Sequence, residues 1–174
     1  FPYNCASNTP LCSTGGTFPG ITSDASGNVY FTDRNAGKLF VWNAGSNSLA
    51  SYSGFTKPTG ISVIGNVAYV AENIANGNIA SFSTQTNSIT GRVATNGAPF
   101  DVKNVGGTPV WSSNSTDHQI CALQGACVNT NQANYYMATG SGGQVFFGYL
   151  GSAGVGQVLN LTPPTYTTYT FTGV

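Results

Sequence analysis

Short runs of apolar and β-branched residues, separated by turn residues, make up most of the chain. Runs such as Val29-Tyr30-Phe31 are rich in Val, Ile, Phe, Tyr and Thr, and Gly, Asn, Asp and Ser stand between them. Turn dipeptides such as Gly27-Asn28 and Gly65-Asn66 favour tight hairpins, and no segment sustains a helical period. The pattern therefore predicts an all-β fold. Because both faces of the runs are apolar, we expect the sheets to be covered on both sides.

The runs recur with a period of about 40 residues, which is typical of repeat architectures. Residues 19–52 read PGITSDASGNVYFTDRNAGKLFVWNAGSNSLASY and residues 58–92 read PTGISVIGNVAYVAENIANGNIASFSTQTNSITGR, with the Gly-Ile pairs offset by 40. A degraded third copy begins at Pro99. A fourth follows from Tyr135, and the β-branched and aromatic run at residues 165–172 is its expected last strand.

Four strands in each 40-residue unit are typical of a β-propeller blade. We therefore predict a small β-propeller of about four four-stranded blades, in a single domain over residues 1–174. The expected blades are residues 17–56, 57–96, 97–131 and 132–174, preceded by a disulfide-looped N-terminal segment at residues 1–16. A single β-sandwich is the alternative, but it does not explain the 40-residue phase.

The segment PGITSDASGNVYFTDRNAGKLFVWN resembles a repeat of the NHL and streptogramin-lyase (virginiamycin B lyase) group of propellers. That group is similar in blade style to the gluconolactonase and strictosidine-synthase-like propellers. The resemblance covers residues 19–92 well and extends to about residue 123. Such families usually have six or seven blades, whereas this chain supplies four. We favour a closed four-bladed ring over an open array completed by another chain, because an open array exposes apolar blade faces.

The composition favours an extracellular protein and excludes several classes. Charged residues make up 6% of the chain, five basic and five acidic, with a formal net charge of zero. The basic residues are scattered singly, which argues against nucleic acid as a partner. No apolar run reaches the roughly 20 residues of a membrane span. Ser, Thr and Asn contribute 56 residues, so hydroxyl and amide groups hydrate the surface.

The cysteines indicate an oxidising compartment. Cys5, Cys12, Cys121 and Cys127 allow three pairings, of which we favour the two local ones, Cys5–Cys12 and Cys121–Cys127. Neither spacing is that of a zinc site. No leader with a charged and then an apolar region begins the sequence, so we expect any secretion signal to have been removed. Asn114 and Asn160 lie in glycosylation sequons, which a chain so rich in Asn, Ser and Thr also contains by chance.

The resemblance also implies a candidate metal site. In the lactonase-like relatives, carboxylates and amides at the central tunnel hold a divalent cation, for which Ca²⁺ or Mg²⁺ would be suited to oxygen ligands. The matching candidates here are Glu72, Asn73, Asp101 and Asp24. The competing interpretation is that Glu72 and its repeat equivalent Asp33 accept hydrogen bonds from turn amides, and we favour it.

Catalytic and ligand-binding side chains are sparse. His118 is the only imidazole and lies in a Ser-Thr-Asp-His-Gln turn. The lyases are believed to use His and Glu with magnesium, and His118 does not match a motif position, so that activity does not carry over. Trp42 is a candidate platform for stacking on a sugar ring, because aromatic faces pack against apolar CH groups. We expect Trp111 to be a core residue.

These observations favour a secreted, non-enzymatic propeller for extracellular surface recognition or self-assembly into filaments or matrix. The expected partners are further copies of the chain or extracellular glycans, with no cofactor. The alternatives are a metal-dependent lyase or lactonase-like enzyme, or a carbohydrate-binding lectin. We also expect Gly20 and Gly60 to tolerate substitution poorly, because blades converge there, whereas Lys57 and Arg92 are expected to behave as isolated surface charges.

Overall fold

A computed structural model of the chain describes residues 19–115, 118–130, 134–141, 143–149, 156–160 and 168–171. These residues form sixteen β-strands and no helix. The first blade contains β1 (Ile21–Ser23), β2 (Val29–Asp33), β3 (Lys38–Asn43) and β4 (Ser48–Ser53). The second contains β5 (Pro58–Ile64), β6 (Val67–Glu72), β7 (Asn78–Ser83) and β8 (Ser88–Ala94). The third contains β9 (Pro99–Val105), β10 (Thr108–Ser113), β11 (Gln119–Ala122) and β12 (Cys127–Asn129). The fourth contains β13 (Asn134–Thr139), β14 (Gln144–Tyr149), β15 (Gly156–Asn160) and β16 (Thr168–Phe171).

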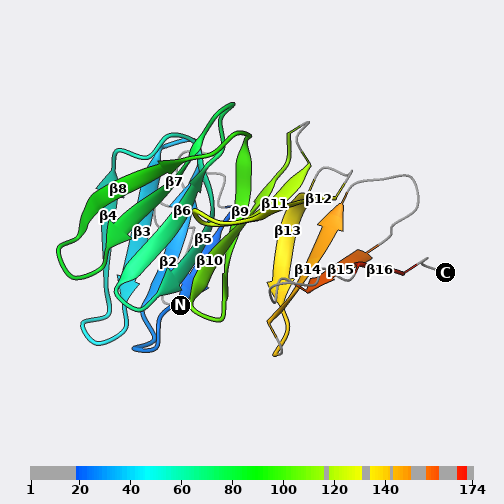
Figure 1. Cartoon of the computed structure of the whole chain (residues 1–174). Coiled ribbons are helices and arrows are strands. Elements are labelled where there is room, and N and C mark those ends of the chain that lie inside the picture. The colour runs from blue at the N-terminus through cyan, green and yellow to red at the C-terminus, as the bar shows by residue number, and fades with distance from the viewer. Residues whose placement is uncertain are drawn as a thin grey trace, which may run out of the picture.

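Each blade is a separate four-stranded antiparallel sheet whose strands pair in chain order. In Figure 1 the first two blades, blue to green, overlap on the left, and the fourth blade, yellow to red, lies on the right. The predicted fold class, an all-β propeller of four-stranded blades, is confirmed. The C-terminal run supplies β16, which pairs with β15 as the outer strand of the fourth blade.

The turn residues that suggested hairpins supply the left-handed backbone that tight turns require. Gly27 and Gly65 have φ values of 81° and 57° in the first turns of the first two blades. Asn47 and Asn87 have φ values of 50° and 54° in the last turns of the same blades. Gly and Asn are the residues that adopt this conformation at least cost. The repeat therefore preserves turn chemistry as well as strand pattern.

The hydrophobic core lies between blades. Tyr30 and Leu39 of the first blade pack with Ile61, Val70 and Phe82 of the second in one buried cluster. Because each sheet is covered by its neighbour, residues on both faces of a central blade can be buried.

Two more clusters continue this arrangement. Ala71 and Ile79 of the second blade pack with Trp111 and Cys121 of the third, and Val110 of the third belongs to a cluster with fourth-blade residues. Trp111 is 6% exposed, which confirms its prediction as a core residue.

The inner strands of successive blades converge so closely that glycine is required. A Cβ on Gly20 would collide with the carbonyl oxygen of Thr59. A Cβ on Gly60 would lie 2.5 Å from Oδ1 of Asp101 and 2.8 Å from the carbonyl oxygen of Phe100. These contacts give the physical reason for the Gly-Ile pairs of the repeat.

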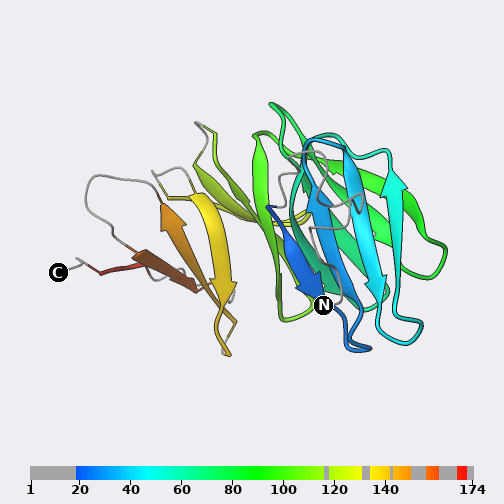
Figure 2. The same ribbon diagram turned by 180° about the vertical axis from the view of Figure 1, so that it is seen from behind.

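The described blades form an arc and do not close into a ring. The main inter-blade contacts join β1 to β5, β5 to β9 and β9 to β13. In Figures 1 and 2, β2–β4 and β14–β16 lie on opposite sides of the molecule. The closed four-bladed ring that we favoured from the sequence is therefore not what the described residues form. Four blades at this curvature turn through only part of a circle.

Candidate functional site

The candidate polar residues lie at two opposite ends of the blades. In an antiparallel meander, the turn after the second strand lies at the same end as the link to the next blade. We call this the link end. It is formed by the β2–β3, β6–β7 and β10–β11 turns and by the links at residues 54–57 and 95–98.

Glu72, at the end of β6, is 1% exposed and is held by an internal ion pair. Its Oε2 accepts a hydrogen bond from Nε of Arg92 at 2.8 Å, and its Oε1 accepts one from Nη2 at 3.1 Å. The amide of Thr56 donates to Oε1 at 2.9 Å. The hydrogen bonds to Glu72 raise the pKa of Arg92. Arg92 also donates to the carbonyl of Gly54, so the expectation that it is an isolated surface charge is wrong.

Asp101, in the inner strand β9, connects blades. Its Oδ2 accepts a hydrogen bond from the amide of Met137 in the fourth blade at 2.8 Å. Its Oδ1 accepts one from the amide of Val102 at 2.8 Å and one from Nζ of Lys103 at 3.1 Å. The side chain is buried and lies against Gly60 of the second blade. Asp101 therefore joins the inner strands of three blades.

Asp24 caps the β1–β2 turn, at the opposite end of the first blade. Its carboxylate accepts hydrogen bonds from the amides of Ser26 and Asn28, from the Asn28 side chain and from the Tyr30 hydroxyl. Although burial alone would raise it, these hydrogen bonds together hold the pKa of Asp24 below its usual value. Burial and the bond to Asp24 raise the pKa of Tyr30 to about 12.

Asp33 accepts hydrogen bonds from the amides of Asn35 and Ala36, both at 2.9 Å. This confirms that it organises the turn that follows its strand. The four metal candidates are not brought together, because Asp24 lies at one end of the blades and Glu72 and Asn73 at the other. Within the described part of the chain, no three His, Cys, Asp or Glu side chains are grouped so that they could hold a metal ion.

Asn73 belongs instead to a row of polar side chains along the link end. Nη2 of Arg34 lies 3.4 Å from Oδ1 of Asn73, whose Nδ2 donates to Oδ1 of Asn114 at 3.0 Å and to the carbonyl of Pro99 at 3.1 Å. Arg34, Asn73 and Asn114 each follow the second strand of their blade. The row ties three blades together at equivalent repeat positions.

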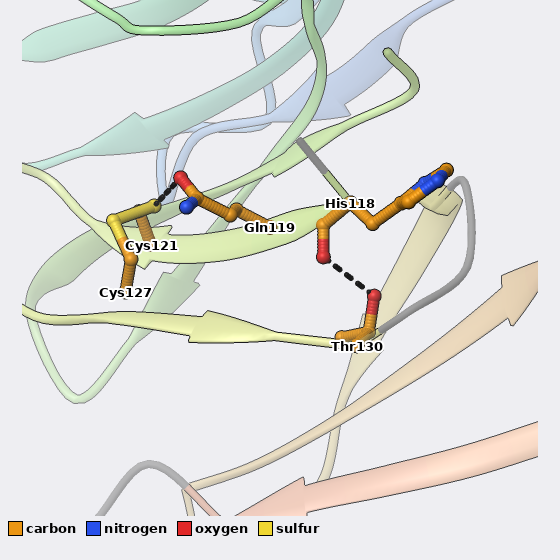
Figure 3. The surroundings of a disulfide bond; sticks show 5 residues. All are labelled: His118, Gln119, Cys121, Cys127 and Thr130. Carbon is orange, nitrogen blue, oxygen red and sulfur yellow. Dashed lines mark hydrogen bonds between the residues drawn. A yellow bond between two sulfur atoms is a disulfide. The ribbon is translucent and has the colours of Figure 1, made fainter. Parts of the chain in front are cut away.

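The hairpin of β11 and β12 carries the Cys121–Cys127 disulfide, whose two residues are directly opposite each other (Figure 3). The side chain of Gln119 points toward this disulfide and that of His118 points away from it. Nδ1 of His118 is buried and no described residue bonds to it, while the His118 carbonyl accepts hydrogen bonds from Thr130.

The remaining candidate residues are the possible sugar-stacking tryptophan, the two sequon asparagines and the N-terminal cysteines. Trp42 is half-buried, and its Nε1 donates to Oδ1 of Asn47 at 3.3 Å. Asn114 is half-buried in the polar row, whereas Asn160 lies in β15, with its side chain outside the described residues. Cys5 and Cys12 also lie outside the described residues.

A pocket of about 170 Å³ opens between the second and third blades. One wall is formed by the end of β8 and by Thr95 and Asn96, which follow it. The other wall is formed by Trp111, Gln119 and the disulfide hairpin of the third blade. None of its lining residues is charged.

Comparison of the whole fold with known structures decides its class. Virginiamycin B lyase from Staphylococcus aureus superposes on 90% of this chain and 55% of its own, with a TM-score of 0.72 at 16% identity. A streptogramin B lyase covers 88% of this chain and 54% of its own, with a TM-score of 0.69 at 19% identity. BamB from Moraxella catarrhalis covers 87% and 47%, with a TM-score of 0.68 at 12% identity. The chain has the fold of an NHL-like β-propeller.

The chain spans about half the length of the solved structures that it matches. No protein-family model and no curated protein sequence matches it. Within the described residues, no helix is long and apolar enough to cross a membrane. At such low identity, the likeness defines the fold and not the activity.

Sequence reasoning missed three features of this propeller. The Arg34–Asn73–Asn114 row was detectable, because its members are 39 and 41 residues apart, close to one repeat. The pocket between blades was not, because it depends on how two blades pack against each other. The Arg92–Glu72 pair was hidden for a different reason, because its two side chains lie in one blade and meet across β7 only when β6, β7 and β8 have paired.

Proposed function

We propose that this protein is a secreted, non-enzymatic β-propeller that recognises other molecules outside the cell. The observation that supports this most is the use of its carboxylates. Asp24, Asp33, Glu72 and Asp101 each accept two or more hydrogen bonds within the protein. A general acid or base must instead reach a substrate proton. Carboxylates tied to turns and neighbouring blades suit a rigid recognition scaffold better than a reactive centre.

Two further features support secretion. The Cys121–Cys127 disulfide suits an oxidising compartment, because cytosolic thiols are kept reduced. The outer strands β4 and β8 expose mainly small residues (Ser, Thr, Ala and Gly) to solvent, with Arg92 as their one charged residue. Non-reducing peptide mapping tests the Cys121–Cys127 pairing in the native protein and also tests the predicted Cys5–Cys12 pairing. A cross-link of Cys5 to Cys121 or Cys127 would contradict the predicted local pairing.

A metal titration separates recognition from the alternative, a metal-dependent lyase or lactonase-like enzyme. We expect millimolar Ca²⁺ or Mg²⁺ to leave the Tm of EDTA-treated protein unchanged. A specific metal at 100 times its Kd would add about 2.7 kcal/mol, or about 5–11 °C in a chain of this size. Enzymatic activity is tested by incubation with Quinupristin, which is bound to a catalytically inactive virginiamycin B lyase in one matching structure. A metal-dependent rise in Tm together with conversion of Quinupristin to a product of different chromatographic retention would refute the proposal.

Self-assembly is a second candidate, favoured by the outer face of the fourth blade. Phe146 is 41% exposed, and because its neighbours Val145 and Phe147 in β14 are buried in the core, it lies on the other face of the sheet. We propose a second copy of this chain as the occupant, because zero net charge removes the repulsion that would oppose it. Sedimentation should show weaker association for Phe146→Ser than for Ile21→Ser, the matched change in the first blade. Equal association for both variants contradicts this assignment.

A further inference from the structure

The pocket between the second and third blades has the size of a single ring. Its volume of about 170 Å³ is close to that of an engineered protein cavity, roughly 150 Å³, that holds benzene. Its lining residues come from the end of β8 and the start of the link after it, and from β10, β11 and β12 with their connecting turn, and include no residue of the inner strands or of the Arg34–Asn73–Asn114 row. It is therefore a separate site from any central tunnel.

The walls of the pocket combine the accessible part of one indole, that of Trp111, which is 6% exposed, with unpaired hydrogen-bond donors. Trp111 lines the pocket, and no described residue accepts a hydrogen bond from its indole N–H. Nδ1 of His118 is the one fully buried polar side-chain atom without a partner among the described residues. The Trp111 indole N–H, which also has no described partner, is therefore not fully buried and is open to solvent.

Gln119 adds a second set of donors. Its Oε1 lies 3.8 Å from Sγ of Cys121, but this sulfur is in a disulfide and has no S–H to donate. No described residue accepts a hydrogen bond from the amide N–H groups of Gln119. Asn96 and Gln124, both exposed, place two further amides at the rim. With no charged lining residue, the pocket suits a neutral ligand that has an apolar ring face and oxygen acceptors.

The rim of the pocket is held in place by the disulfide. Cys121 and Cys127 are cross-strand partners and lie only six residues apart, so the bond closes a small loop. A cross-link over so short a loop contributes modestly to global stability, and its main effect is local. It fixes the hairpin that carries Gln124, and a rigid rim lowers the entropic cost of binding.

We propose that this pocket binds one hydroxylated six-membered ring, a hexopyranose of an extracellular glycan. The apolar face of the sugar would pack toward Trp111, and its hydroxyl oxygens would accept hydrogen bonds from Trp111 and Gln119. This inference rests on the proposed recognition role and names its ligand class and site.

The test is a titration of the whole chain with glucose, galactose, mannose and N-acetylglucosamine. The variant Trp42→Phe leaves Trp111 as the single indole of the chain, so its fluorescence reports on the pocket. We expect a saturable change with a millimolar Kd for at least one sugar, confirmed by calorimetry. The acyclic polyol sorbitol, which has hydroxyls but no ring, should give none.

Three variants locate the binding site. Gln119→Ala should weaken the sugar about fivefold, and Ala94→Phe, which fills the pocket from an exposed wall position, should abolish binding. Gln85→Ala removes an exposed amide in the β7–β8 turn and should change nothing. The Tm of each variant shows that it is folded.

Specific results overturn the inference. Absence of saturable binding to every sugar, equal binding of sorbitol, or undiminished binding by Ala94→Phe would each do so. Saturable binding of an uncharged peptide in place of any sugar would also refute the ligand class. If sugars fail while metal ions leave the Tm unchanged, this inference falls and the proposed non-enzymatic function stands.

Discussion

Replacing Arg92 by Gln should destabilise the protein far more than its surface position suggests. The change removes both hydrogen bonds from Arg92 to Glu72, whose side chain is 1% exposed, and leaves the Thr56 amide as the one described donor to that carboxylate. Stranding one member of a buried ion pair costs about 3–5 kcal/mol. Because the Arg92 side chain is 37% exposed, water can reach part of the site, and we expect a loss of about 2–3 kcal/mol.

Urea unfolding followed by circular dichroism measures this free energy, and the Tm should fall by about 4–12 °C. The control is Lys57→Gln, which removes an exposed positive charge that has no ion-pair partner among the described residues. It should lie within about 0.5 kcal/mol of the wild type. The double variant Arg92→Gln, Glu72→Gln should recover part of the loss, because the uncompensated buried charge is gone. If Arg92→Gln is as stable as Lys57→Gln, the pair does not compensate Glu72 and our reasoning is wrong.

Three further predictions test other features. Gly60→Val should cost about 3 kcal/mol or more in unfolding free energy, because its Cβ meets backbone, whereas Gly91→Val, with open space around its Cα, should cost little; equal losses would contradict the blade register. Because the folded pKa of Tyr30 is raised to about 12, the stability it contributes is present below pH 10 and lost as the pH rises toward 12. Tyr30→Phe should abolish that alkaline loss in a pH series of unfolding curves, and an unchanged series would refute it. Deleting residues 165–174 removes β16 and should give an unstable monomer or one that no longer assembles, whereas a wild type that stays monomeric at millimolar concentration excludes self-assembly.

The repeat made the blades predictable because each one is local in sequence. Hairpins that begin at Gly27 or Gly65 need only neighbouring residues, and the spacing between Gly20 and Gly60 encodes where inner strands converge. Turn chemistry and strand pattern agreed in the first two copies, and the 40-residue phase made the other two sheets recognisable. Closure was not predictable, because the curvature between blades is set by side chains packed across them.

The roles of individual acidic residues were harder to predict. Asp24 belongs to a motif in which Ser26 and Asn28 follow at turn spacing, and a local cap was readable there in place of a metal ligand. Glu72 gave no such signal. Its partner Arg92 lies two strands away in the sheet, beyond a register shift between Ser81 and Phe82.

The clusters that join the blades imply an uneven resistance to opening. Among the described residues, the second and third blades each share a core with two neighbours, whereas the first and fourth share one each. Stability in such stacked units is approximately a sum of nearest-neighbour interfaces, so unravelling starts at the ends of the array. The interface around Trp111 is therefore the last to separate. A ligand held there would meet an ordered wall even while the outer blades fluctuate, and the hairpin closed by Cys121 and Cys127 would keep its shape through those excursions.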